Sequence, residues 1–207
     1  MLHLKYVLVF ILFGIFASNA QTIRFAPEMI VGNRSTGYQH FIEFKMNKAW
    51  SIQNISVFDS EHTTNKNNIF FIRNMLSYTL NAHFKANLAI GVKNPGKFVT
   101  FSSQYQYTTS TFRLHYSVGS TYQNGFTLEQ TFNLNYTPIL SKNIQGYIHL
   151  SVVINTNFKV LNRGIEQLRF GIIKNEKLIT GLAVNLDQFT KAEKTLENFG
   201  VFIKYNF

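Results

Sequence analysis

The feature that most constrains the fold is a hydrophobic period of two that recurs along most of the chain. From Phe126 to Tyr136, all but one of the even positions are apolar or aromatic, whereas the odd positions carry Thr, Glu and Asn. The same alternation runs through residues 78–92 and 144–154. Successive side chains of a β-strand point to opposite faces of a sheet, so this pattern indicates strands with one apolar and one polar face.

Ten segments carry this pattern and are separated by turn-forming residues. They are Tyr38–Met46, Ala49–Asp59, Ser77–Val92, Phe98–Thr108, Thr111–Tyr122, Phe126–Thr137, Ile144–Thr156, Ile165–Lys174, Leu178–Phe189 and Leu196–Phe207. Thr22–Val31 and Asn68–Leu76 are apolar enough to be two further strands. The sequence therefore predicts an all-β, antiparallel up-and-down barrel of about ten strands, with eight to twelve compatible with the pattern.

Four short turns predict how neighbouring strands pair. Paired strands must place their apolar faces on the same side, which decides whether a loop has an odd or an even length. All four turns satisfy this rule. The predicted partners are Val92 with Val99, Tyr107 with Phe112, Tyr122 with Phe126, and Ile172 with Leu178.

The first twenty residues are predicted to be a cleaved signal peptide. Lys5 supplies a positive start, Tyr6–Phe16 is an apolar run, and Ser18 and Ala20 are small residues at a cleavage site. The run is shorter than the roughly 20 residues of a spanning helix. We expect residues 21–207 to form a single barrel domain, with no membrane helix.

Composition excludes several classes of function. The chain has no cysteine, which rules out disulfides and thiolate metal sites. Its formal charge is +10, but the basic residues are scattered singly along strands of an exported chain, so we predict no nucleic-acid partner. Anionic lipid or anionic solutes are more plausible partners. No cofactor or metal site is predicted, because antiparallel strands do not by themselves bring His83, His115 and His149 together.

Two kinds of barrel fit the alternation. A soluble periplasmic lipid-binding barrel would turn its apolar face inward, toward a cavity. A transmembrane barrel would turn it outward, toward lipid. Strands of ten or more residues can cross a bilayer, and aromatic residues at strand ends match interfacial girdles. We therefore predict a transmembrane barrel.

The end of the chain carries the only specific resemblance. Val201, Ile203, Tyr205 and Phe207 alternate with mostly polar residues in the final strand, and the last residue is aromatic. This tail resembles the C-terminal signature of bacterial outer-membrane β-barrel proteins, and the Phe-, Asn- and Lys-rich composition is similar to that of small Bacteroidota barrels. The resemblance implies a location in the outer membrane, contact with its lipids, and recognition of Tyr205 and Phe207 by the barrel assembly machinery. Phe202 departs from the pattern, because it lies on the polar face.

An outward apolar face would leave the polar face to line the lumen. The lumen-lining candidates are Lys85, Arg113, His115, Glu129, Arg169 and Lys204. The predicted register places Arg113 opposite Asn135, His115 opposite Asn133, and Arg169 opposite Gly181. Two interpretations remain open: a packed interior whose polar groups satisfy one another, and a narrow pathway biased toward anions. The predicted function is a non-enzymatic outer-membrane barrel, either structural or a narrow solute pore.

The alternative is a lipid-modifying hydrolase. His149 and Ser151 are two residues apart on one strand face, close enough for a base and a nucleophile, and Glu166 would complete the set. The pattern resembles the His-x-Ser pair of outer-membrane lipid A deacylases. However, His115-Tyr116-Ser117 repeats the motif, and His149 and Ser151 are expected on the lumen face. We therefore predict no catalytic site.

Overall fold

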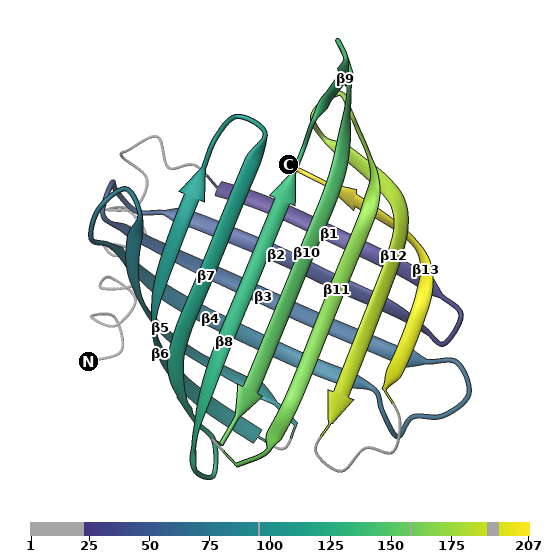
Figure 1. Cartoon of the computed structure of the whole chain (residues 1–207). Helices are drawn as coiled ribbons and strands as arrows, with labels where there is room; N and C mark the ends of the chain where they lie inside the picture. Colours follow the sequence, from purple (N-terminus) through teal and green to yellow (C-terminus); the bar gives the residue numbers. More distant parts are fainter. Residues whose placement is uncertain (1–22, 95, 158, 190–194) are drawn as a thin grey trace, which may run out of the picture.

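The computed structural model describes residues 23–94, 96–157, 159–189 and 195–207, which form a closed antiparallel β-barrel (Figure 1). Twelve strands of 10 to 14 residues make the wall. They are β1 (Ile23–Gly32), β2 (Ser35–Lys45), β3 (Trp50–Glu61), β4 (Ile69–Thr79), β5 (Phe84–Lys93), β6 (Gly96–Thr108), β7 (Phe112–Tyr122), β8 (Phe126–Tyr136), β10 (Ile144–Thr156), β11 (Leu161–Lys174), β12 (Leu178–Phe189) and β13 (Leu196–Tyr205). The predicted signal peptide lies outside the described residues.

Each strand of the wall pairs with its neighbours in sequence, and β1 closes the barrel against β13. The short strand β9 (Ile139–Ser141) lies outside this order, because it pairs with the start of β10 as a hairpin that projects from one end. We call the end that carries Ile23 and Tyr205 the terminal end. The opposite end, with the β1–β2 and β3–β4 turns, is the loop end.

The twelve-strand alternative is the correct one, and the single strand predicted over Ser77–Val92 is wrong. β4 ends at Thr79 and β5 begins at Phe84. Asn81 Oδ1 shapes the turn by accepting hydrogen bonds from the backbone N–H groups of His83 and Phe84, at 2.8 and 3.0 Å. Tyr78 pairs with Ala86, so the apolar face continues on even positions through the turn. The alternation therefore concealed a turn that contains neither Gly nor Pro.

The predicted strand registers put each side chain on the correct face of the sheet, but only one of the four predicted residue pairs is correct. Tyr122 pairs with Phe126 as predicted. The other three predicted pairs are wrong by two residues: Val99 pairs with Ile90, Tyr107 with Leu114, and Ile172 with Thr180. A slip of two residues keeps every side chain on its face, so parity alone could not detect it.

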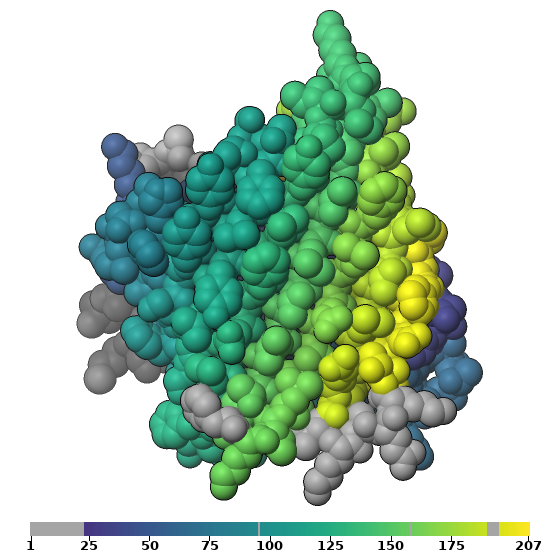
Figure 2. All heavy atoms as spheres, in the orientation of Figure 1, coloured from purple at the N-terminus to yellow at the C-terminus, as the bar shows by residue number. Residues whose placement is uncertain are grey.

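The apolar face points outward. Leu80, Phe101 and Val201 are 61%, 62% and 56% exposed on the outer wall. The closely packed outer surface of this wall is seen in Figure 2, and exposed apolar side chains on it include Phe170 and Leu182. This orientation contradicts the soluble lipid-binding alternative, which requires the apolar face inside. Among the described residues, no helix has the length and apolarity to cross a membrane.

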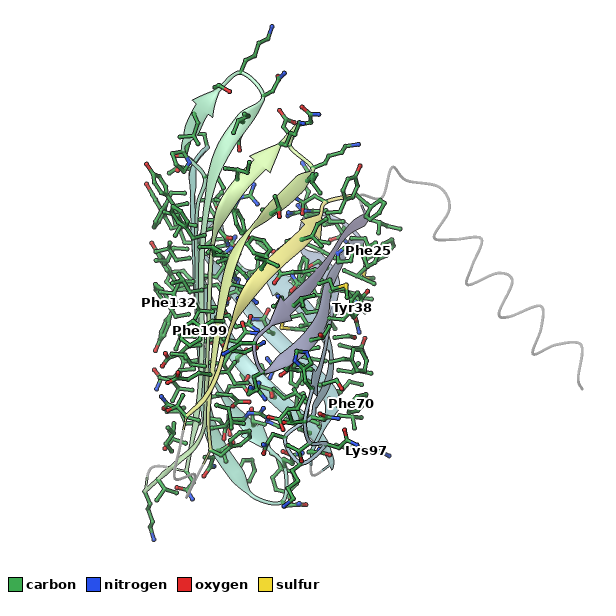
Figure 3. All side chains as sticks on the ribbon, turned by 90° about the vertical axis from the view of Figure 1, so that its right-hand side faces the viewer. Phe25, Tyr38, Phe70, Lys97, Phe132 and Phe199 are labelled. Carbon is green, nitrogen blue, oxygen red and sulfur yellow. The ribbon has the colours of Figure 1, made fainter. Side chains whose placement is uncertain are left out.

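Viewed from the side, the barrel has two opposed walls (Figure 3). Gly171 of β11 pairs with Gly181 of β12, where the backbones approach closely. A Cβ on Gly181 would lie 2.1 Å from the carbonyl oxygen of Phe170 and 2.5 Å from Gly171 Cα. Glycine pairs of this kind occur where a sheet bends tightly, and only glycine fits there.

Candidate functional site: the charged lumen

The lumen contains charged side chains at three levels along the barrel axis. We call them the loop-end layer, the middle layer and the terminal-end layer. Their members come from strands on both walls, because every second residue of each strand points inward. The layers differ in how completely their charges are paired.

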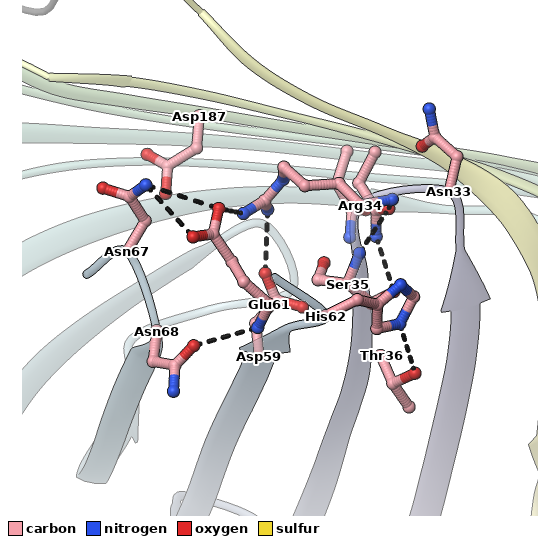
Figure 4. Close-up of polar contacts among 12 residues, drawn as sticks. Asn33, Arg34, Ser35, Thr36, Asp59, Glu61, His62, Asn67, Asn68 and Asp187 are labelled. Carbon is pink, nitrogen blue, oxygen red and sulfur yellow. Dashed lines mark hydrogen bonds and ion pairs between the residues drawn. The ribbon is translucent and has the colours of Figure 1, made fainter. Parts of the chain in front are cut away.

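Arg34 is the centre of one half of the loop-end layer (Figure 4). Its guanidinium donates hydrogen bonds to Asp59 Oδ2 at 2.9 Å and to Glu61 Oε1 at 2.5 Å. Asn67 Nδ2 also donates to the Glu61 carboxylate, at 3.3 and 3.2 Å. A guanidinium between two carboxylates forms charge-assisted hydrogen bonds with a defined geometry, so this end of β1–β3 is tightly held.

Asn198 of β13 holds the β1–β2 turn that presents Arg34. Its Oδ1 accepts hydrogen bonds from the backbone N–H groups of Arg34 and Ser35, at 3.0 and 3.1 Å. Its Nδ2 donates to the carbonyl oxygen of Ser35 at 3.3 Å. A Cβ on Gly32 would overlap this side chain, at 2.1 Å from Oδ1. Glycine at position 32 therefore makes room for Asn198.

Two further ion pairs complete the loop-end layer. Arg73 of β4 contacts Glu129 of β8 at 2.5 Å, which joins strands four places apart in the sheet. Arg163 donates to both carboxylate oxygens of Asp187, at 3.0 and 2.6 Å. Lys93 lies over the Phe98 ring, 5.0 Å from its centroid. The layer thus contains four cations (Arg34, Arg73, Lys93, Arg163) and four anions (Asp59, Glu61, Glu129, Asp187) and is neutral overall.

The middle layer is built around Arg169, which is 0% exposed. Its Nε donates to Glu28 Oε1 at 2.8 Å, and its Nη1 donates to Asn185 Oδ1 at 2.8 Å. Gln39 Nε2 donates to the same Glu28 oxygen at 2.8 Å, and Lys204 Nζ lies 3.9 Å from the other. A buried pair of this kind is stable only when each charge retains its partner.

An apolar cluster packs beside Arg169 inside the barrel. It consists of Ile30, Tyr147, Ile173, Ile179, Ala183 and Phe202, all buried. The Tyr147 and Phe202 rings have centroids 6.0 Å apart. Tyr147 pairs with Gly171, and Phe202 pairs with Gly181, so the rings flank the two glycines that lack side chains. Phe202, the residue that departs from the C-terminal pattern, therefore fills the lumen beside the bend.

The terminal-end layer has an excess of cations. Arg24, Lys45, Lys85 and Arg113 face one carboxylate, that of Glu43, which leaves three positive charges in excess. Glu43 lies 3.9 Å from Arg24 and accepts a hydrogen bond from Gln53 at 3.1 Å. Within the described part of the chain, neither Lys85 nor Arg113 has an ion-pair partner. His115 of β7 lies within electrostatic range of Lys85, Arg113, Glu43 and Arg24, so these groups share one region.

The predicted lumen residues fall into these layers. Arg113 pairs with Asn135 and His115 with Asn133, as the register predicted. Arg169 pairs with Ala183 and not with Gly181, because the β11–β12 turn shifts the register by two residues. Lys85, Arg113 and His115 lie in the terminal-end layer, Arg169 and Lys204 in the middle layer, and Glu129 in the loop-end layer.

Sequence analysis missed several charged partners. Glu28 and Arg73 lie on β1 and β4, the two strands that entered only as an alternative. Arg34 lies in a turn and reaches back into the barrel. One signal was available in the sequence: Asp59 and Glu61 are two residues apart and so share one face of β3, where they could have been expected to need a cation.

Of the three hydrolase candidates, His149 and Ser151 share a face as predicted, but Glu166 does not join them. His149 and Ser151 lie on the inner face of β10, opposite Arg169 and Gln167. Glu166 pairs with Val152, an outward position, so its carboxylate is on the opposite face of the sheet. Among the described residues there is also no group of three His, Cys, Asp or Glu side chains that could hold a metal ion.

Comparisons with known proteins find similar folds but no similar sequences. No protein-family model matches the chain, and no curated protein matches it. Among solved structures, the KdgM porin in complex with disordered oligogalacturonate is similar, with a TM-score of 0.59, 8% identity, and coverage of 89% of this chain and 99% of that one. The NanC porin has a TM-score of 0.58 and 8% identity, with coverage of 90% of this chain and 99% of that one. An outer-membrane channel of Pseudomonas putida F1 has a TM-score of 0.50 and 11% identity, with coverage of 90% of this chain and 94% of that one. The chain thus has the fold of small outer-membrane porins.

Proposed function

We propose that this protein is an outer-membrane β-barrel that acts as a narrow pore biased toward small anions, and that it is not an enzyme. The observation that carries the proposal is the terminal-end layer, where four cations face one carboxylate. Rings of fixed charge bias which ions enter a pore, and positive side chains favour anions. The porin fold of the similar structures supports the same conclusion.

The route past the middle layer lies away from Arg169. Arg169, Glu28 and the apolar cluster fill the side of the lumen formed by β1 and β10–β13. Lys85 on β5 and Arg113 on β7 belong to the other side. An anion would therefore pass along β4–β8, close to Lys85 and Arg113, and would meet the Arg73–Glu129 pair that joins β4 and β8 at the loop end.

The orientation in the membrane follows from the two ends. Bacterial barrels have their termini and short turns on the periplasmic side; here the termini decide the assignment, because the β9–β10 hairpin also projects from the terminal end. The terminal end would therefore face the periplasm, and the loop end the outside. The C-terminal tail would serve as the assembly signal. Phe207 N donates to the carbonyl oxygen of Phe25 at 2.9 Å, and their rings stack with centroids 5.5 Å apart. Outer-membrane lipids and the assembly machinery are the partners that this proposal requires.

Conductance in planar bilayers tests the pore. We expect the parent protein to form small channels whose reversal potential in a KCl gradient indicates anion preference, and galacturonate oligomers are suitable anionic blockers to try. A Lys85→Gln/Arg113→Gln variant should lose most of that preference, a several-fold drop in the anion-to-cation permeability ratio. Lys97→Gln is the matched control, because Lys97 lies on the outer surface at the loop end (Figure 3). Cation preference in the parent, or equal effects of the variant and the control, would refute the proposal. If correctly inserted barrels show no conductance, the pore is refuted and a structural role in the membrane is the interpretation that stands.

A further inference from the structure

Four polar side chains form a hydrogen-bonded cluster on the outer wall. His40 of β2, Asn54 and Ser56 of β3, and Asn74 of β4 lie side by side. Asn54 Oδ1 is 2.9 Å from His40 Nε2 and accepts from Ser56 Oγ at 3.1 Å. Asn54 Nδ2 donates to Asn74 Oδ1 at 2.9 Å. We call these residues the outer polar cluster.

The cluster lies at mid-height of the apolar band. Along β3 and β4, the Asn54–Asn74 pair is flanked four residues away by Trp50–Tyr78 toward the terminal end and by Phe58–Phe70 toward the loop end. Each flanking pair is about 13 Å away along the strand. These aromatic pairs mark the two edges of the band. The polar groups are therefore at the depth where acyl chains offer no hydrogen-bond partner.

The opposite wall is mostly apolar on its outer face, with Gln130 of β8 and Glu166 of β11 as polar exceptions. Its central outward residues are Leu114, Phe132, Leu134, Leu150 and Val152. Gln130 accepts a hydrogen bond from the Tyr116 hydroxyl at 2.8 Å and so has a partner of its own. The β2–β4 wall is thus distinguished by four outward polar side chains that hydrogen-bond one another across three strands. Polar groups facing the bilayer interior mark functional contacts.

The cluster also has hydrogen-bonding capacity left over. The Asn74 side chain is exposed, and its Nδ2 donates to no other described residue. The cluster has no carboxylate or permanent cation, and it presents amide donors and amide acceptors together. A surface with both functions can pair with itself across a two-fold axis, since a donor on each copy can then meet an acceptor on the other.

We propose that the outer wall of β1–β4 is a homodimer interface, with the outer polar clusters of two copies in contact at its centre. Tyr38 and Phe70 project from this wall, which runs as one side of the barrel in Figure 3. Four strands about 4.8 Å apart, crossing an apolar band about 25 Å tall, present roughly 480 Å² per copy. Two copies would bury about 1,000 Å², the lower range of a specific interface. Apolar packing would supply the area, and the amides would fix the register.

Cysteine cross-linking in native outer membranes tests the contact. The chain contains no cysteine, so a single introduced thiol reports only on its own surroundings. We expect oxidation to yield a covalent dimer from at least one of Ile52→Cys, Ile72→Cys and Asn74→Cys, which share this wall. Phe132→Cys on the opposite wall is the control and should remain monomeric. Failure of all three to cross-link, or cross-linking to a different protein, would overturn the proposal.

Mass measurement in mild detergent tests the role of the amides. The parent should have twice the chain mass, and an Asn54→Leu/Asn74→Leu variant should fall to the monomer mass. Gln130→Leu on the other wall should remain dimeric. Heat-modifiable gel mobility must be the same in all three proteins, which shows that each barrel is folded. A dimeric double variant, or a parent that is monomeric in both detergent and membrane, would contradict the inference.

Discussion

The loop-end and terminal-end layers of the lumen differ in pairing although both are rich in basic residues. At the loop end, four cations are balanced by four carboxylates, and Arg34, Arg73 and Arg163 each contact an acid at 2.9 Å or less. At the terminal end, Lys85 and Arg113 share a region with one carboxylate that is already beside Arg24. Paired charges hold the wall together, whereas unpaired charges remain available to a solute. The buried middle layer is the extreme case of pairing.

The largest expected effect is at the buried pair. Arg169→Met leaves Glu28 charged and without its main partner, so we expect the free energy of unfolding to fall by about 3–5 kcal/mol. Urea unfolding in phospholipid vesicles, followed by the fluorescence of the single tryptophan, Trp50, would measure it. Adding Glu28→Met should restore much of the loss. A double variant as unstable as Arg169→Met would show that packing, and not the unpaired charge, causes the loss.

A smaller effect is expected at the loop end. Arg34→Met removes hydrogen bonds to Asp59 and Glu61, but water can reach this end, so the loss should be about 1.5–3 kcal/mol. The same unfolding measurement applies, with His62→Ala as the control. Among the described residues, the exposed His62 side chain bonds only to Thr36, at 3.0 Å, and its backbone bond to the carbonyl oxygen of Arg34 survives the substitution. An Arg34→Met variant as stable as the control would mean that the cluster does not hold the β1–β3 turns.

The smallest effect on stability is expected where charges are unpaired. Lys85→Met removes a cation that lacks an ion-pair partner among the described residues, so the free energy of unfolding should change by no more than about 0.5 kcal/mol. An increase is compatible with this expectation, because neighbouring cations repel it. A loss comparable to that of Arg34→Met would end the contrast between the two layers, since Lys85 would then be structural.

The sequence predicted the faces of the strands well, because each face depends only on local alternation. Leu80 and Val201 are outside, and Arg113 and His115 are opposite the predicted residues. Partners across the lumen could not be predicted. Arg73 meets Glu129 only because the sheet closes into a barrel of a particular shear, a property of the entire wall. The outer polar cluster was also missed, since His40, Asn54 and Asn74 belong to three different strands.

The asparagine at position 198 links the two ends of the polypeptide. Its side chain shapes a hairpin whose backbone amide at Arg34 is 164 residues away in sequence. During synthesis this hairpin leaves the ribosome long before the strand that secures it. The first turn can therefore reach its final geometry only when the circle of strands is joined, and Arg34 is presented to its acids by the same event. Closure of the barrel between β1 and β13 and ordering of the β1–β2 turn at the loop end therefore occur in one step.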